Sequence, residues 1–153
     1  MPVDLLKAMA WVETRWQTPP LPETADLEDD HAAPAYGIMA LRPAPWDTLS
    51  LATRLVGADE QTLVFDRQAN IRGAAAVLRH LAGPGDIQLE AWEGAVARFG
   101  AAHDEQAGAQ YVASVYSLLD TGMRGYTEEG LVMHVGGHGA VDLPTYEVRA
   151  QAL

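Results

Sequence analysis

Prolines and glycines recur along this chain at intervals that leave room for a succession of short helices, and this spacing constrains the fold more than any other feature. Proline ends a helix, and glycine is the residue that most often follows a helix end. Such residues follow each apolar segment of helical period, at Pro19, Gly57, Gly83, Gly100 and Gly122. The sequence therefore predicts a mainly α-helical fold, and its 153 residues suffice for one sizeable core.

Capping residues define the expected helices more closely. Asp47, Asp59 and Asp66 each precede an apolar segment, and short polar side chains accept hydrogen bonds from the free amides at a helix start. Asn70 is interpreted in the same way, as a capping residue and not as a ligand contact. The predicted helices cover residues 3 or 4–16, 47 or 48–56, 59–64, 67–81, 89–99 and 103–121.

The sequence changes character after Gly125. Residues 131–135 and 140–143 are apolar, and Gly136-Gly137-His138-Gly139 separates them. This pattern favours a β-hairpin with its turn at 136–139, or an extended tail. We therefore expect a helical domain over residues 1–125 and a hairpin or extended tail over residues 126–153, which leads to a further domain in a longer chain.

Composition excludes several classes of partner. The net charge of -11, from 21 acidic and 10 basic residues, disfavours binding of nucleic acid or of an anionic membrane by charge neutralisation. No apolar run is long enough to span a membrane, and the first residues do not resemble a signal peptide. The chain has no cysteine, so disulfides and thiolate metal sites are excluded. We expect no nucleic-acid partner and no membrane insertion.

The stretch AWVETRW, residues 10–16, carries an acidic side chain on an apolar stripe. In a helix, Glu13 lies on the same face as Met9 and Trp16. One interpretation is that Glu13 reaches solvent or pairs with a cation such as Arg98. The other is that its apolar neighbours keep it protonated near neutral pH, so that it can act as a proton donor. Periodicity alone is compatible with both.

Four segments of the chain, in this order, resemble the lysozyme-like fold of soluble lytic transglycosylases and goose-type lysozymes. AWVETRW contains a Glu-Thr pair at a predicted helix end, and AYGIMALRP is similar to an Ala-x-Gly-Leu-Met-Gln-x-x-Pro turn. FDRQANIRG is similar to an Asp-x-x-x-Asn-Ile-x-x-Gly helix start, and LEAWEGAVARFGA to a helix that ends in Ala-Tyr-Asn-x-Gly. The resemblance implies a mainly α lysozyme-like domain with a short C-terminal hairpin or tail.

The same resemblance implies a site that acts on peptidoglycan glycan strands, with no cofactor and no metal. In this family the glutamate of the first motif, here Glu13, is the general acid that protonates the oxygen between N-acetylmuramic acid and N-acetylglucosamine. Breaking a glycosidic bond needs that proton on the departing oxygen. Tyr36 and Met39 equally suit the core of a tight turn. The positions that match substrate-contacting residues of the family are Tyr36, Gly37, Met39, Arg98 and Phe99.

This chain departs from the family pattern where polar side chains are expected. The glutamine of the second motif is Ala40, and the tyrosine and asparagine of the fourth are Phe99 and Gly100. In the family these groups orient the glycan or lie near the acid. Arg98 either replaces part of these contacts or pairs with Glu13. The departures favour a second hypothesis, a glycan-binding or positioning module with weakened catalysis.

The sequence leaves the type of cleavage open. A transglycosylase needs one carboxylate, because a hydroxyl of the sugar itself attacks, whereas an inverting hydrolase needs a second acid roughly 6.5–9.5 Å away to activate water. Candidates for a second acid lie in the proline-rich stretch 18–34, although a solvated acidic loop is the simpler interpretation. They are Glu23, Asp26, Glu28, Asp29 and Asp30.

The combination of Glu-Thr, Tyr-Gly-Ile-Met and Ala-Asn-Ile-Arg-Gly-Ala-Ala is most similar to the lysozyme-like region ahead of the catalytic domain in some bacterial N-acetylmuramoyl-L-alanine amidases. This resemblance implies a fragment of a cell-wall amidase, with an attached amidase domain as partner and an extracytoplasmic or secreted location for the longer precursor. The zinc chemistry of an amidase is not expected in this chain. His134 and His138 flank two glycines in a predicted turn and do not share a helix face.

Overall fold

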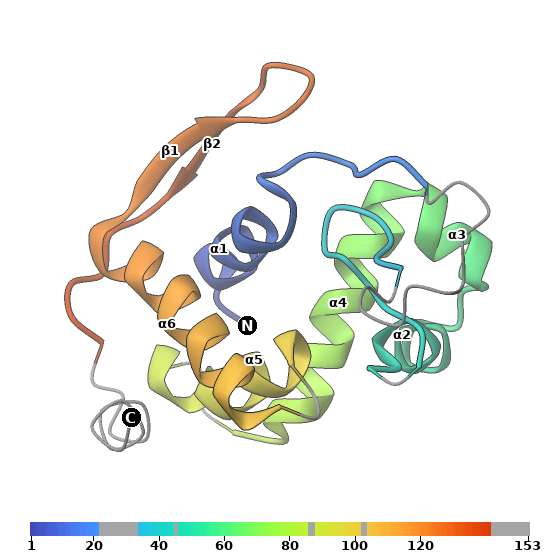
Figure 1. The fold of residues 1–153 in the computed structure, drawn as a ribbon, viewed down its shortest axis with the longest axis horizontal. Coiled ribbons are helices and arrows are strands. Elements are labelled where there is room, and N and C mark those ends of the chain that lie inside the picture. The colour runs from blue at the N-terminus through green and yellow to red at the C-terminus, as the bar shows by residue number, and fades with distance from the viewer. Residues whose placement is uncertain (22–33, 45, 86–87, 102–103, 142–153) are drawn as a thin grey trace.

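A computed structural model of the chain describes residues 1–21, 34–44, 46–85, 88–101 and 104–141. Within these ranges the fold is mainly helical and closes with a small antiparallel hairpin, which confirms the predicted fold class (Figure 1). The elements are α1 (Val3–Thr14), α2 (Thr48–Val56), α3 (Glu60–Phe65), α4 (Arg67–Ala82), the 3₁₀ helix η1 (Leu89–Trp92), α5 (Glu93–Gly100), α6 (Glu105–Thr121), β1 (Met123–Tyr126) and β2 (Val132–Val135).

The structure confirms two of the three predicted aspartate caps. Asp59 accepts a hydrogen bond from the Thr62 amide at 2.7 Å, and Asp66 accepts one from the Ala69 amide at 2.8 Å. These bonds satisfy amides that have no partner inside their own helices. Asp47 also precedes its helix, but its side chain makes no capping bond. Local sequence therefore sets most of the helix starts.

The first helix ends two residues before the predicted end at Trp16. Arg15 and Trp16 both adopt left-handed backbone conformations, with φ of 56° and 60°. This reversal turns the Trp16 ring back under α1, where its Nε1 donates a hydrogen bond to the Lys7 carbonyl oxygen at 2.7 Å. Trp16 is fully buried. Burial of a large aromatic ring stabilises a conformation that helical propensity alone disfavours.

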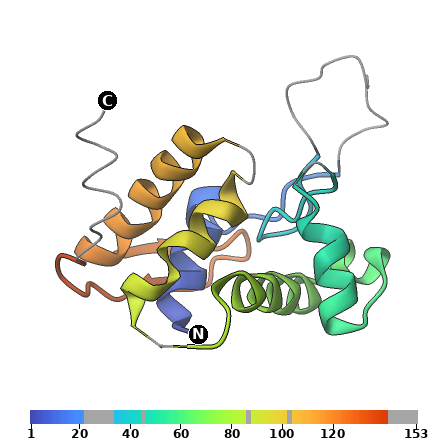
Figure 2. The same cartoon turned by 90° about the horizontal axis from the view of Figure 1, so that it is seen from below.

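The helices form two groups joined by α4 (Figures 1 and 2). Helices α2, α3 and α4 pack on one another, and α1 and α5 each pack on α6, while α4 also contacts α5. The largest buried side chains, Trp16, Trp92 and Phe99, belong to one continuous apolar core. The end of α1 and the segment before α2 therefore meet where the two groups adjoin.

The C-terminal hairpin has a different partner strand from the predicted one. Strand β2 pairs with β1, with Met123 opposite Val135 and Tyr126 opposite Val132. The predicted pairing with residues 140–143 is wrong, and residues 142–153 lie outside the described ranges. A Cβ atom on Gly125 would lie 2.9 Å from the Trp16 ring, so the glycine lets β1 pack directly on that ring. The hairpin therefore packs on the buried aromatic ring that follows α1.

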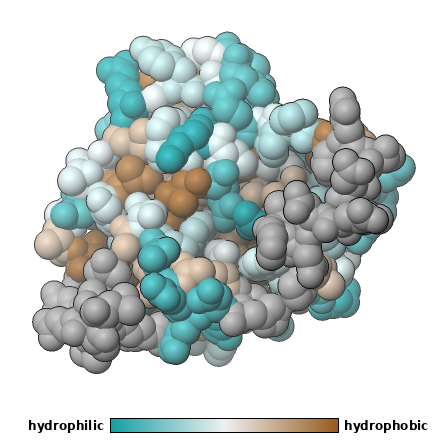
Figure 3. Space-filling view, viewed as in Figure 1, coloured by the Kyte–Doolittle hydropathy of each residue, from teal (hydrophilic) through white to brown (hydrophobic). Residues whose placement is uncertain are grey.

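Exposed apolar side chains are spread over the surface and do not form one large patch on the face shown in Figure 3, where hydrophilic side chains surround small apolar areas. Phe65, at the end of α3, is 68% exposed, the highest value among the large apolar residues in the described part of the chain. No helix in the described ranges is long and apolar enough to cross a membrane.

Candidate functional site: a buried acid–arginine pair

Glu13 lies in the last turn of α1, and its side chain is only 5% exposed. Its Oε2 accepts a hydrogen bond from Arg42 Nη2 at 2.9 Å, and the two side chains form an ion pair. The other oxygen, Oε1, is buried and has no hydrogen-bond partner among the described residues. Arg42 comes from the segment before α2, 29 residues along the chain. The site thus joins the two groups of helices.

Arg98 does not lie beside Glu13, although one interpretation of the sequence placed it there. Its Nε donates to the Gly94 carbonyl oxygen at 3.2 Å, and its Nη2 donates to the Leu81 carbonyl oxygen near the end of α4. A cation at this point is favourable because the carbonyl groups at a helix end carry partial negative charge. Of the alternatives that the sequence left open, pairing of Glu13 with Arg98 is therefore wrong, and pairing with another cation, Arg42, is what the structure shows.

Phe99 and Met39, both predicted to contact substrate, are core residues. Phe99 is fully buried and Met39 is 1% exposed. Their apolar side chains stabilise the fold by removing surface from water. The position of Met39 agrees with the other interpretation of this residue, the core of a tight turn. Neither side chain reaches the surface of the protein.

Tyr111 on α6 is a site residue that the sequence did not reveal. Its hydroxyl oxygen is buried and faces the Glu13 carboxylate. Burial raises the pKa of Tyr111 well above its ordinary value, and the charge and hydrogen-bonding contact of the nearby Glu13 carboxylate raise it further, while the Arg42 charge lowers it. The phenol therefore keeps its proton beside the acid. The only available signal was its position on α6, which does not show what α6 packs against.

Gly100 makes room for this tyrosine. A Cβ atom on Gly100 would lie 2.3 Å from Cδ1 of the Tyr111 ring, far inside van der Waals contact. Gly100, where the motif that it resembles has asparagine, therefore has a structural role, because the ring of Tyr111 occupies the space. Position 99 is phenylalanine where the fourth motif has tyrosine, so it offers no hydroxyl group. Tyr111 places a hydroxyl group near Glu13 instead.

The segment from Tyr36 to Leu41 forms a tight turn beside the acid. The amide and carbonyl of Tyr36 bond reciprocally to those of Leu41 at 2.9 Å, and the Ala40 amide donates to the Gly37 carbonyl oxygen at 3.0 Å. Gly37 and Ala40 have φ values of +70° and +50°. Thr14, the residue after Glu13, places its hydroxyl 2.8 Å from the Ile38 carbonyl oxygen. The Glu-Thr pair thus contacts the turn directly.

Asn70 is not a helix cap but the residue that holds this turn. Its Oδ1 accepts the Met39 amide at 2.9 Å, and its Nδ2 lies 2.9 Å from the Tyr36 carbonyl oxygen and 3.0 Å from that of Leu63. Asn70 is fully buried. A Cβ atom on Gly37 would lie 2.2 Å from Asn70 Nδ2. The glycine is therefore required for the close approach of the turn to Asn70.

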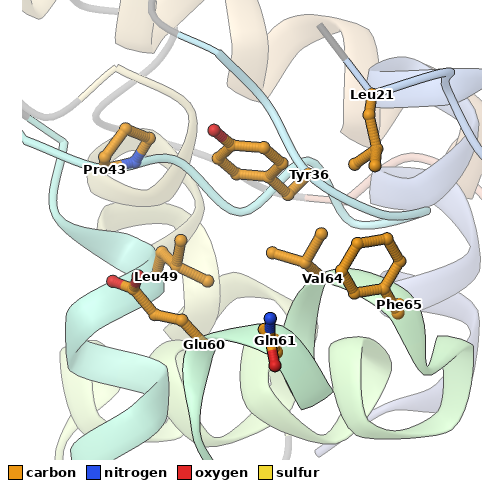
Figure 4. Close-up of a pocket in the computed structure, with 8 residues that line it drawn as sticks. All are labelled: Leu21, Tyr36, Pro43, Leu49, Glu60, Gln61, Val64 and Phe65. Carbon is orange, nitrogen blue, oxygen red and sulfur yellow. The ribbon is translucent and has the colours of Figure 1, made fainter. Parts of the chain in front are cut away.

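Tyr36 and Gly37 each line a hollow in the surface. Tyr36 belongs to a hollow of about 340 Å³ between the turn and α3, in which Leu21 and Tyr36 lie across from Val64 and Phe65 (Figure 4). Gly37 belongs to a second hollow, of about 470 Å³, which Val64 and Phe65 also line. Glu13 is not among the residues that line either hollow. Of these two predicted contact residues, Tyr36 is partly exposed, whereas Gly37 is buried in the turn.

No cluster in the described ranges offers three histidine, cysteine or acidic side chains to a metal ion. His138 instead lies 3.1 Å from an Asp4 carboxylate oxygen. The candidate second acids, Glu23, Asp26, Glu28, Asp29 and Asp30, all lie outside the described residues.

The described residues define a mainly helical protein with a buried acid–arginine pair where two groups of helices meet. No protein-family model, curated protein or solved structure matches this chain. The assignment of a function therefore rests on the motifs of the sequence and on the geometry around Glu13.

Proposed function

We propose that this chain is a peptidoglycan-processing, lysozyme-like domain that cleaves the bond between N-acetylmuramic acid and N-acetylglucosamine with Glu13 as general acid. The longer protein would be a bacterial cell-wall amidase, an N-acetylmuramoyl-L-alanine amidase. Peptidoglycan lies outside the cytoplasmic membrane, so the proposal implies an extracytoplasmic or secreted place of action.

The observation that carries the proposal is the buried Glu13 carboxyl group at the end of α1, with the buried hydroxyl of Tyr111 beside it. A buried, ionisable side chain beside a specific charged or polar partner is a feature typical of functional sites. A carboxyl group next to a neutral phenol suits delivery of a proton to a leaving oxygen. The hollows lined by Tyr36 and Gly37 support binding of a ligand close to the same turn.

A second candidate is a module that holds the glycan for an attached amidase without cleaving it. The Arg42 ion pair favours this candidate, because it engages Oε2 of Glu13 in a contact that holds the two groups of helices together. The departures at Ala40, Phe99 and Gly100 favour it as well, since they remove polar groups of the family pattern. In both candidates the ligand is the glycan, and they differ only in whether a glycosidic bond is cleaved.

Digestion of purified cell wall with wild type and with Glu13→Gln separates the two candidates. We expect wild type to release glycan fragments with anhydro or reducing ends, and Glu13→Gln to lose at least about a hundredfold in rate, the usual contribution of general acid catalysis. Both proteins should bind soluble muropeptides alike, because the variant keeps the shape of the side chain.

The matched control is Glu90→Gln, which changes an exposed glutamate on η1. It should digest the wall like wild type. Binding by all three proteins with no release of glycan at any pH would leave only the holding module.

A further inference from the structure

The ion pair between Glu13 and Arg42 conflicts with the chemistry of the proposed function. A general acid must carry a proton before it can donate one. Arg42 Nη2 lies 2.9 Å from Glu13 Oε2, where a guanidinium stabilises the ionised form of a carboxyl group. Arg42 therefore has to release Glu13 before Glu13 can protonate a leaving oxygen.

The structure allows Arg42 to move its side chain while its backbone stays in place. The Arg42 amide donates to Thr48 Oγ1 at 2.8 Å, and its carbonyl oxygen accepts the Leu49 amide at 2.9 Å. The Arg42 side chain is 21% exposed, and its guanidinium makes one further hydrogen bond, to the Ala40 carbonyl oxygen at 3.3 Å. A guanidinium has five N–H donors. Donors thus remain for a second anion that approaches from solvent.

Release of Arg42 would remove the cation that is hydrogen-bonded to Glu13. Tyr111 also lies beside Glu13, and it stays neutral because burial and the Glu13 charge both oppose its ionisation. The Glu13 side chain is 5% exposed, and burial of a carboxylate without a cation costs free energy. Departure of Arg42 and uptake of a proton by Glu13 are therefore coupled.

We propose that a carboxylate carried by a muramic acid residue of the glycan takes Arg42 away from Glu13, and that Glu13 then binds one proton from solvent and becomes the general acid. This inference rests on the proposed function and makes Arg42 a positioning residue that also sets specificity. The net charge of -11 opposes a general attraction of anions, so the recognition has to be local.

Two groups on muramic acid carry the required chemistry. One is the lactyl carboxylate, which is free only after the stem peptide has been removed, and the other is a carboxylate of the stem peptide itself. If the anion is the lactyl group, an amide hydrolysis must supply the substrate of this domain. That order of reactions would suit a domain attached to an amidase.

Calorimetry in two buffers of different ionisation enthalpy tests the exchange, because it measures the protons taken up when a ligand binds. The ligands are N-acetylglucosamine disaccharide, the N-acetylglucosaminyl-N-acetylmuramic acid disaccharide with a free lactyl carboxylate, and the same disaccharide with its stem peptide. The proposed reaction breaks the bond from C1 of N-acetylmuramic acid to N-acetylglucosamine. In these ligands the glycosidic bond starts from C1 of N-acetylglucosamine instead, so none of them is cleaved by that reaction. We expect uptake that approaches about one proton per bound ligand as the pH falls from 7 to 5.

This uptake should occur with one or both carboxylate ligands and not with the neutral disaccharide. Uptake with the lactyl ligand identifies the stripped glycan, and uptake with the peptide ligand alone identifies the stem peptide. Glu13→Gln should bind all three ligands without taking up protons. Wild type should also bind the preferred anionic ligand about tenfold more tightly than the neutral one.

Variants of Arg42 provide the second arm. Arg42→Gln should lose both the preference and the uptake, whereas Arg42→Lys keeps the charge and should keep part of both even if Arg42→Gln folds poorly. Arg54→Gln removes an equal charge from the exposed face of α2 and should behave like wild type.

Equal uptake with neutral and anionic ligands, no uptake with any ligand, or a preference that survives Arg42→Gln would overturn the exchange. Digestion of the wall by wild type without such uptake would overturn the exchange and leave the proposed function intact. Uptake without digestion would keep the exchange and exclude cleavage. Absence of binding by every ligand would overturn both.

Discussion

Gly100 and Tyr111 depend on each other, although one belongs to α5 and the other to α6. The ring of Tyr111 fills the space that any side chain at position 100 would need, with a Cβ-to-ring distance of 2.3 Å. This contact brings the phenol to Glu13, where its pKa is raised mainly by burial. Because Gly100 has no Cβ atom, the Tyr111 ring has the space that it needs to place its hydroxyl group beside Glu13.

Gly100→Ala should therefore displace the Tyr111 ring. We expect a loss of about 1–3 kcal/mol in the free energy of unfolding, the usual cost of overpacking, and a fall in glycan cleavage greater than the loss of folded protein explains. Chemical denaturation and wall digestion measure the two effects. Gly94→Ala on the same helix is the control, because nothing lies within 4 Å of its Cβ position. Equal effects of the two substitutions would contradict this account.

The β-hairpin is held to the start of α4 by one arginine. Arg67 forms ion pairs with Glu128 and Glu129, which lie between β1 and β2, and its Nη2 also lies 3.1 Å from Thr18 Oγ1. These side chains are about one third to one half exposed, from 32% to 48%. Exposed pairs contribute little to global stability, about 0–1 kcal/mol. Their expected role is therefore local, in fixing the tip of the hairpin.

Arg67→Gln should free the hairpin tip without unfolding the protein. The amides of Thr127 and Gly130, which are bonded within the tip, should exchange with solvent several times faster, because the tip opens locally. The melting temperature should change by less than about 4 °C. Hydrogen exchange followed by NMR measures both regions in one sample. Arg72→Gln, elsewhere on α4, should leave the tip unchanged, and unaltered exchange in Arg67→Gln would exclude the proposed role.

At the scale of the whole molecule, Asp4 links the two ends of the described chain. Its carboxylate lies 3.1 Å from Lys7 Nζ and 3.1 Å from His138 Nε2. Partial burial is the largest single effect on the pKa of Asp4 and raises it, but hydrogen bonds from Lys7 and His138, the Lys7 charge and the Gly136 amide outweigh it. The pKa therefore falls below its ordinary value.

This lowered pKa makes the stability depend on pH in one direction. The contribution of Asp4 is fully present above the unfolded-state pKa, about 3.9, and is lost as the pH falls through the lower folded-state value. Asp4→Asn should therefore cost about 0.2–1 kcal/mol near pH 6, where the pair is screened by solvent, and nothing near pH 2. Denaturation curves at several pH values test this. Asp120→Asn, at an exposed position on α6, should show no such dependence.

Local sequence determined the helical class of this protein, most helix starts and the position of Glu13 at the end of the first helix. Caps such as Asp59 and Asp66 and the apolar periods act within a few residues, so they are visible in the chain itself. Only the tertiary structure decided that Arg42 pairs with Glu13, that Tyr111 lies beside it and that β1 is the partner of β2. These are contacts between distant segments, and packing selects them from many partners that local patterns leave equally possible.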